Sequence, residues 1–127
     1  MKAIPTDIKT LISRVGFIVE KMLALSGMVR GSFGKTYRRC GKPTCWCADL
    51  KKKGHPCTRL VWTDETGAKT RSVQKDDIQT VAEAVGQYRE FKQMRRQLRV
   101  EEEKLEELLN DFEGETIKNS RSKLGYL

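Results

Sequence analysis

The sequence predicts an α+β protein in which a small β module lies between an N-terminal helix and a long C-terminal helix. Three observations support this prediction. An apolar stripe with helical spacing lies near the N-terminus, a glycine-rich and cysteine-rich middle leads into a hairpin pattern, and a longer stripe follows. The 127 residues fit one small domain, which we divide into segments 1–30, 31–75, 76–112 and 113–127.

The first segment is predicted to form a helix from Asp7 to Val29. Pro5 and the capping residues Thr6 or Asp7 mark its start, and Gly27 and Gly31 weaken its end. Charged residues interrupt this segment, so a membrane-spanning helix is excluded here. The apolar residues recur at steps of three and four: Ile8, Leu11, Val15, Ile18, Met22, Leu25 and Val29.

The second segment carries a hairpin pattern after a loop rich in glycine and proline. Residues 58–63 and 68–73 read as strands joined by a turn at residues 64–67, and residues 33–38 fit a third short strand. Alternation along the first of these strands puts Leu60 and Trp62 on one face, which predicts that Trp62 is a core residue.

The third segment predicts a long helix that opens at Lys75 or Asp76 and ends at Asn110 or Phe112. Its apolar alternation breaks between Tyr88 and Phe91. One interpretation is two helical faces, one on the β module and one on the first helix. The alternative is a coiled coil that forms a homodimer. Residues 113–127 are polar without a period and predict a flexible tail.

Four cysteines and the only histidine of the chain fall within eighteen residues. A zinc ion needs about four nitrogen or sulfur donors from a short segment. The predicted set is Cys40, Cys45 and Cys47 with either His55 or Cys57 as the fourth ligand. Four protein ligands leave no open coordination position, so Zn²⁺ is the expected cofactor and its expected role is structural.

The same cluster also fits four reduced cysteines that pack as small apolar residues, a redox pair, or a thiol-based redox sensor. A disulfide between Cys45 and Cys47 would close a small, strained ring. The first ten residues lack the pattern of a secretory signal, so we expect a cytoplasmic, reducing location that disfavours disulfides.

The positive charge is concentrated around the cysteines. The net charge of the chain is +8, and residues 30–75 hold twelve Lys and Arg against three Asp and Glu. Part of this excess can balance metal-bound thiolates, and the remainder predicts a nucleic-acid partner, DNA ahead of RNA. Tyr37 and Trp46 are candidates for stacking on bases. The candidate nucleic-acid-binding residues are Arg30, Lys35, Tyr37, Arg38, Arg39, Lys42, Lys51, Lys52, Lys53, Arg59, Lys69 and Arg71.

Catalysis is not expected. The single histidine belongs to the cysteine cluster, and no paired carboxylates stand near the basic segment. The sequence therefore favours a non-enzymatic, zinc-binding, nucleic-acid-binding protein. The alternative is an interaction adaptor that uses its helices to bind a protein and its zinc site only to fold.

The run from Tyr37 through Cys40, Cys45 and Cys47 to Ala48 resembles a small prokaryotic family of unknown function. Its members share the signature Tyr-Arg-x-Cys-Gly-Lys-Pro-x-Cys-x-Cys-Ala and are often encoded near transposases. The resemblance covers about residues 31–99 and implies metal binding through the three cysteines and His55. It also implies a mobile-element or phage accessory role, with a recombinase or transposase as a candidate partner. The family more often has His-Gly-Pro at residues 55–57, so the fourth ligand stays open.

Overall fold

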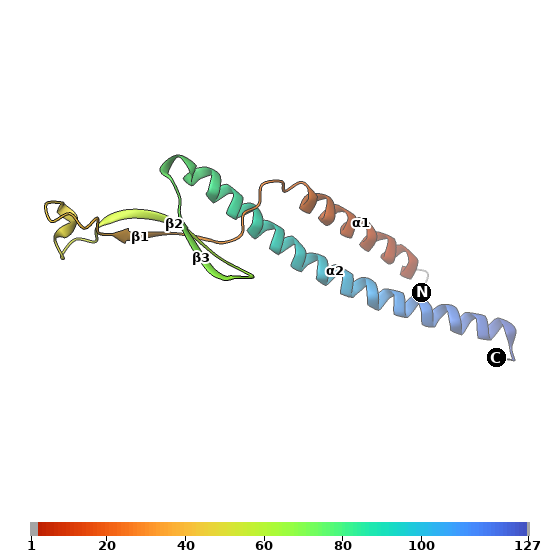
Figure 1. Cartoon of the computed structure of the whole chain (residues 1–127). Helices are drawn as coiled ribbons and strands as arrows, with labels where there is room; N and C mark the ends of the chain where they lie inside the picture. Colours follow the sequence, from red (N-terminus) through yellow and green to blue (C-terminus); the bar gives the residue numbers. More distant parts are fainter. Residues whose placement is uncertain (1–2, 127) are drawn as a thin grey trace. The chain divides into compact units, whose positions relative to one another are not determined.

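The structure, a computed structural model, describes residues 3–126 and confirms the predicted α+β architecture (Figure 1). Short 3₁₀ turns lie at Trp46–Ala48 and Lys75–Asp77. The chain divides into two compact units. The helical unit comprises the N-terminal segment through Ser26 and the chain from Glu90 onward, and the β unit comprises Gly27–Arg89. The main elements are α1 (Ala3–Leu23), β1 (Ser32–Arg38), β2 (His55–Asp64), β3 (Gly67–Ser72) and α2 (Ile78–Leu124).

Helix α1 begins and ends earlier than predicted. Thr6 and Asp7 lie inside it and do not cap it, since Pro5 is tolerated in the first helical turn. The helix stops at Leu23, not at Val29. The reason lies in the β unit, where the backbone N–H groups of Gly27 and Val29 donate to Gln87 Oε1 (3.1 Å) and to the Ala84 carbonyl (3.1 Å). These bonds hold residues 27–29 in a non-helical path.

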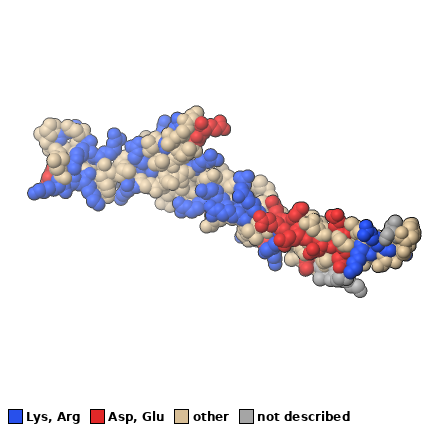
Figure 2. Space-filling model, turned by 90° about the horizontal axis from the view of Figure 1, so that it is seen from below, with Lys and Arg blue, Asp and Glu red and all other residues tan. Residues whose placement is uncertain are grey.

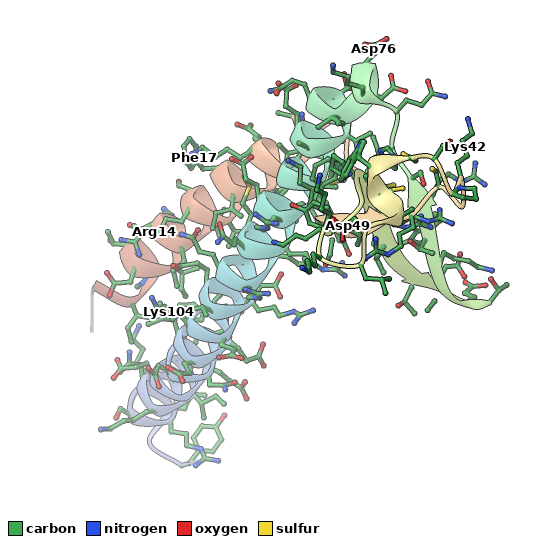
Figure 3. All side chains as sticks on the ribbon, turned by 90° about the vertical axis from the view of Figure 1, so that its left-hand side faces the viewer. Arg14, Phe17, Lys42, Asp49, Asp76 and Lys104 are labelled. Atoms are coloured by element: carbon green, nitrogen blue, oxygen red, sulfur yellow. The ribbon has the colours of Figure 1, made fainter. Side chains whose placement is uncertain are left out.

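Within the helical unit, α1 runs antiparallel beside the C-terminal part of α2 (Figure 1). Leu11 and Ile18 of the predicted α1 stripe are buried at 5% and 6% exposure. Glu101 of α2 is also buried, and its carboxylate lies 3.9 Å from Arg14 Nη1 and 3.7 Å from Lys104 Nζ. Figure 3 labels Arg14 and Lys104 on the two helices. The seam between these helices is therefore apolar with one buried carboxylate.

Three antiparallel strands in the order β1-β2-β3 form the sheet of the β unit. Leu60 and Trp62 on β2 point to one face, as the alternation predicts, and both are partly buried. With Val81 of α2 they line a cavity of about 520 Å³. Val85, one turn further along α2, is 4% exposed. The first turns of α2 thus add apolar side chains to those that β2 supplies in this unit.

Helix α2 continues without interruption from Ile78 to Leu124. This corrects the predicted end at Asn110 or Phe112, because residues 113–124 of the predicted tail are helical; residue 127 lies outside the described residues. A single Gly114 costs a helix only about 1 kcal/mol, and the flanking residues favour helix. The helix ends at Gly125, whose φ of 71° and N–H bond to the Arg121 carbonyl (2.9 Å) form a left-handed cap.

The two compact units divide α2 between Arg89 and Glu90. The break in apolar alternation between Tyr88 and Phe91 falls at this boundary. Among residues 3–126, none of the helices combines the length and the apolar character that are needed to cross a bilayer.

Candidate metal centre

The four candidate ligands are brought together by the metal loop, which we define as residues 39–54 between β1 and β2. Arg38 pairs with His55 in the sheet, so the loop leaves and re-enters the sheet at neighbouring positions. Gly54 makes the return possible with a φ of 100°. A Cβ atom there would lie 2.8 Å from the Arg38 carbonyl oxygen, a distance that no larger residue can tolerate.

Inside the metal loop, tight turns and one arginine hold the backbone. The N–H of Cys45 donates to the Lys42 carbonyl (3.1 Å), and the N–H of Ala48 donates to the Cys45 carbonyl (3.0 Å). The guanidinium of Arg39 donates to the carbonyls of Cys47, of Asp49 (3.0 Å) and of Lys52 (2.8 Å). Arg39 therefore ties together both halves of the metal loop.

The donor atoms of Cys40, Cys45, Cys47 and His55 all lie within 4.8 Å of one another. Cys40 Sγ is 3.4 Å from Cys47 Sγ, and Cys45 Sγ is 3.2 Å from His55 Nε2. In a tetrahedral site with metal–sulfur bonds of about 2.3 Å, ligand atoms are about 3.5–3.8 Å apart. The observed spacing fits one ion that is bound by three thiolates and one imidazole, so this cluster can hold a metal.

The surroundings of the exposed Cys40 favour its thiolate form, and those of the buried Cys47 do not. The backbone N–H of Lys42 lowers the pKa of the Cys40 thiol to about 6, with further hydrogen bonds from Cys47, His55 and Cys45. Cys47 is fully buried. A backbone hydrogen bond from Cys40 lowers its pKa, but burial and the neighbouring sulfurs raise it more. A metal cation in the cluster would remove the mutual repulsion of these sulfurs.

Cys57 lies outside the cluster. Its sulfur is 3.6 Å from Ser72 Oγ and 3.9 Å from the Thr58 carbonyl. The hydroxyl of Ser72 and, after it, Arg59 lower the pKa of this thiol. The sequence leaves the fourth ligand open between His55 and Cys57, and the geometry selects His55. All four cysteines are free thiols in this structure.

Residues 6–83 match a protein family described as a domain of unknown function, DUF6788. That match covers more than half of the 127 residues and contains the whole metal loop. The chain belongs to the DUF6788 family. No curated protein and no solved structure matches it.

Two exposed aromatic rings of the DUF6788 domain flank the metal ligands. Trp46 is 50% exposed and packs edge-on against the His55 ring at 4.8 Å between centroids. Lys52 Nζ lies 5.9 Å from the Trp46 centroid, and Lys53 Nζ lies 5.2 Å from the centroid of Tyr37, which is 46% exposed. Both rings therefore offer an open surface next to a cation.

Three of the twelve predicted nucleic-acid residues have protein partners that engage their guanidinium groups. Arg39 holds the metal loop through its carbonyl contacts. Arg59 donates to Thr70 Oγ1 (3.1 Å) and Ser72 Oγ (3.2 Å) on β3, and Arg30 lies 5.7 Å from the Tyr88 centroid. These arginines help to build the domain, and this lowers the number of cations that are free to bind a ligand.

The remaining predicted cations divide between the sheet and the metal loop. Lys35 and Arg38 are exposed on β1, on opposite faces, and Lys69 and Arg71 are on β3, where Arg71 lines the cavity beside Trp62. Lys42 and Lys51 are exposed on the metal loop, and Figure 3 shows Lys42 projecting outward. Figure 2 shows Lys and Arg over much of the visible surface of the β unit.

The structural roles of Arg39 and Gly54 are not predicted from the sequence. Arg39 stands beside Arg38 and precedes a ligand, but nothing in the sequence separates an arginine that binds carbonyls from one that faces solvent. Gly54 does carry a signal, because a glycine directly before a ligand at the end of a loop often marks a close backbone approach.

Proposed function

We propose that this chain is a non-enzymatic nucleic-acid-binding protein whose β unit is held together by a zinc ion. Three thiolates and an imidazole are the donor set that zinc prefers in structural sites. When bound, the ion would crosslink the metal loop and β2 through Cys40, Cys45, Cys47 and His55. The four ligands fill a tetrahedral shell, so the site supplies stability and not a reaction centre.

The observation that carries the proposal is the pair of exposed rings beside lysines, Trp46 with Lys52 and Tyr37 with Lys53. An unpaired base can stack on such a ring, while the neighbouring ammonium group moves to the phosphate. Lys42 and Lys51 add exposed charge to the same loop. We therefore infer that the ligand is a polynucleotide with unpaired bases, with single-stranded DNA as the first candidate.

Fluorescence anisotropy with labelled single-stranded DNA tests this proposal on the zinc-loaded chain. With about four phosphates neutralised, log K should fall with log salt with a slope near −3. Trp46→Ala should weaken binding by about 1–3 kcal/mol. Duplex DNA and single-stranded RNA of the same length serve as comparison ligands.

Charge-matched variants separate a site from general attraction. Reversing Lys51, Lys52 and Lys53 to Glu should abolish binding. Reversing Lys118, Arg121 and Lys123 at the end of α2 changes the net charge equally and should have little effect. Equal losses in the two triple variants, or binding that is insensitive to salt, would overturn the proposal.

A second candidate function is a helix-mediated interaction adaptor, and exposed apolar side chains on the helical unit favour it. In this function the zinc site only folds the β unit, and the helices bind a recombinase or transposase of a mobile element or a second copy of the chain. Charge reversal at Lys51, Lys52 and Lys53 distinguishes the candidates, because an adaptor would keep its protein partner in that variant.

A further inference from the structure

The helical unit has an apolar row that its own two helices leave exposed. On α1, Ile12 is 56% exposed and Leu23 is 79% exposed, and on α2 Leu109 is 45% exposed. Each follows directly after a member of the apolar stripe: Leu11, Met22 and Leu108. Since successive residues are separated by about 100° around a helix, this row lies beside the buried seam.

The exposed rows of the two helices lie on the same side of the pair. In antiparallel helices that face each other, a step to the next residue rotates both side chains toward the same side of the plane that contains the two axes. α1 and α2 run antiparallel in this unit (Figure 1). The resulting surface, which we call the open apolar face, comprises the exposed Ile12, Leu23 and Leu109 and the half-buried Val19 and Leu98.

A stripe of charges with opposite signs borders the open apolar face on α2. Arg95, Arg99, Glu102 and Glu106 are spaced by four, three and four residues, so they share one side of the helix, and all four are exposed. The stripe belongs to a larger division of charge. Residues 92–99 carry four basic residues and no acidic one, and residues 101–115 carry eight acidic residues and one basic residue. Figure 2 shows the basic and acidic stretches side by side.

The basic and acidic stretches of α2 complement those of a second α2 that runs in the opposite direction. If a second α2 lies antiparallel across the first, with the reversal point between Val100 and Glu101, residue 95 meets residue 106 and residue 99 meets residue 102. Each arginine then faces a glutamate. A parallel second α2 in register would instead place like charges together, which costs free energy.

We propose that the helical unit forms a symmetric homodimer through the open apolar face, with the two α2 helices antiparallel and Arg95 and Arg99 of each copy opposite Glu106 and Glu102 of the other. Twofold symmetry repeats every contact, so the one stripe supplies four ion pairs around an apolar centre. The proposal is independent of nucleic-acid binding, because it uses residues of the helical unit alone.

Sedimentation equilibrium of the full, zinc-loaded chain at several concentrations tests the dimer. Arg95→Glu should weaken the dimer on the order of tenfold, since symmetry counts the lost pair and the new repulsion twice. Glu106→Arg should weaken it similarly, and the double variant should restore it. Arg96→Glu, one residue away and on another side of α2, is the matched control and should leave the dimer unchanged.

A second pair of variants tests the apolar centre. Ile12→Gln should shift the chain toward monomer, and Phe17→Gln should not, because Phe17 lies on the outer side of α1 (Figure 3). The two residues are equally suitable for substitution, at 56% and 59% exposure. Far-ultraviolet circular dichroism confirms that the helices are retained. A wild-type monomer at every concentration, equal effects of the Ile12 and Phe17 variants, or no restoration by the charge swap would overturn the proposal.

Discussion

The β unit and the helical unit both have small apolar cores, and they differ in what else stabilises them. Among the described residues of the β unit, only Cys47 and Val85 are buried apolar side chains, and the metal loop is held by hydrogen bonds to Arg39 and by four converging donors. In the part of the helical unit that the structure describes, the buried side chains are Leu11, Ile18 and Glu101. Few apolar side chains are therefore fully buried in either unit. In our proposals a zinc ion stabilises the β unit, and a second copy of the chain covers the exposed apolar side chains of the helical unit.

Removing the metal should have the largest effect and should separate the two units. Structural zinc contributes about 10–16 kcal/mol of binding free energy in small zinc-finger peptides. A chelator, or the substitution Cys45→Ser, should therefore unfold the metal loop and the sheet while α1 and the C-terminal part of α2 stay helical. Circular dichroism at 222 nm together with NMR of residues 27–89 measures both changes.

Cys57→Ser is the control for that experiment, because this cysteine lies outside the ligand cluster. It should bind one zinc per chain with wild-type affinity, as measured by competition with a chromophoric chelator. Loss of zinc in Cys57→Ser, or a wild-type fold in Cys45→Ser, would contradict the ligand set that the geometry selects.

Substitution of Arg39 should have the next largest effect on the β unit, although its guanidinium contacts none of the metal-ligating atoms. Arg39→Gln removes the contacts with the carbonyls of Cys47, Asp49 and Lys52, which fix the loop that carries the ligands. We expect zinc affinity to fall about 10–100-fold, as is typical for residues that orient metal ligands. Lys at this position should not restore affinity, because an ammonium group cannot span three carbonyls in a planar fork. Arg38→Gln, which leaves these contacts intact, should change zinc affinity little.

In the helical unit, Glu101 offers the opposite experiment, since replacing it should stabilise. Its Oε2 atom is buried without a hydrogen-bond partner, and its two cationic neighbours are 3.7 and 3.9 Å away and largely exposed. Replacing a whole buried ion pair with apolar residues is often neutral or stabilising by about 1–4 kcal/mol, and removing one partner is costly when the other charge stays buried. Here Arg14 and Lys104 are exposed, so their charges stay in solvent when the carboxylate is removed. Glu101→Leu should therefore raise the Tm of the helical unit, and Glu103→Leu, at an exposed position outside the proposed dimer contacts, should not. A lower Tm for Glu101→Leu would show that the ion pairs outweigh the burial cost.

The sequence predicts the elements of this fold better than their ends. Apolar periodicity and turn residues locate both helices and all three strands, because these signals arise within one element. The ends of the helices depend on distant partners. Val29 continues the α1 stripe, yet its N–H bonds to α2, and Phe112 ends the α2 stripe, yet the helix needs no apolar side chain to continue.

The same limit applies to the metal centre. The three cysteines follow from their spacing in the sequence, but the choice between His55 and Cys57 depends on the position of β2 relative to the metal loop. Arg38 pairs with His55 and Thr36 pairs with Cys57, so Cys57 lies two residues deeper in the sheet. Composition and spacing determine neither that register nor the inward path of Arg39.

The smallest expected effect concerns the hairpin turn of the β unit, which should matter little if the metal dominates that unit. Asp64 Oδ1 accepts hydrogen bonds from the hydroxyl (2.7 Å) and the backbone N–H (2.9 Å) of Thr66, and these bonds lower the pKa of Asp64 below 3.8. A lowered carboxyl pKa stabilises the fold above the unfolded value, and this stabilisation is lost as pH falls through the folded value. Asp64→Ala should therefore lower Tm slightly at neutral pH, where the carboxylate is ionised and zinc is bound, by no more than about 2 °C. Asp64→Asn retains the acceptor without the charge and should give an intermediate Tm at neutral pH. A loss in Asp64→Ala as large as that in Cys45→Ser would mean that the hairpin, and not the ion, holds the β unit together.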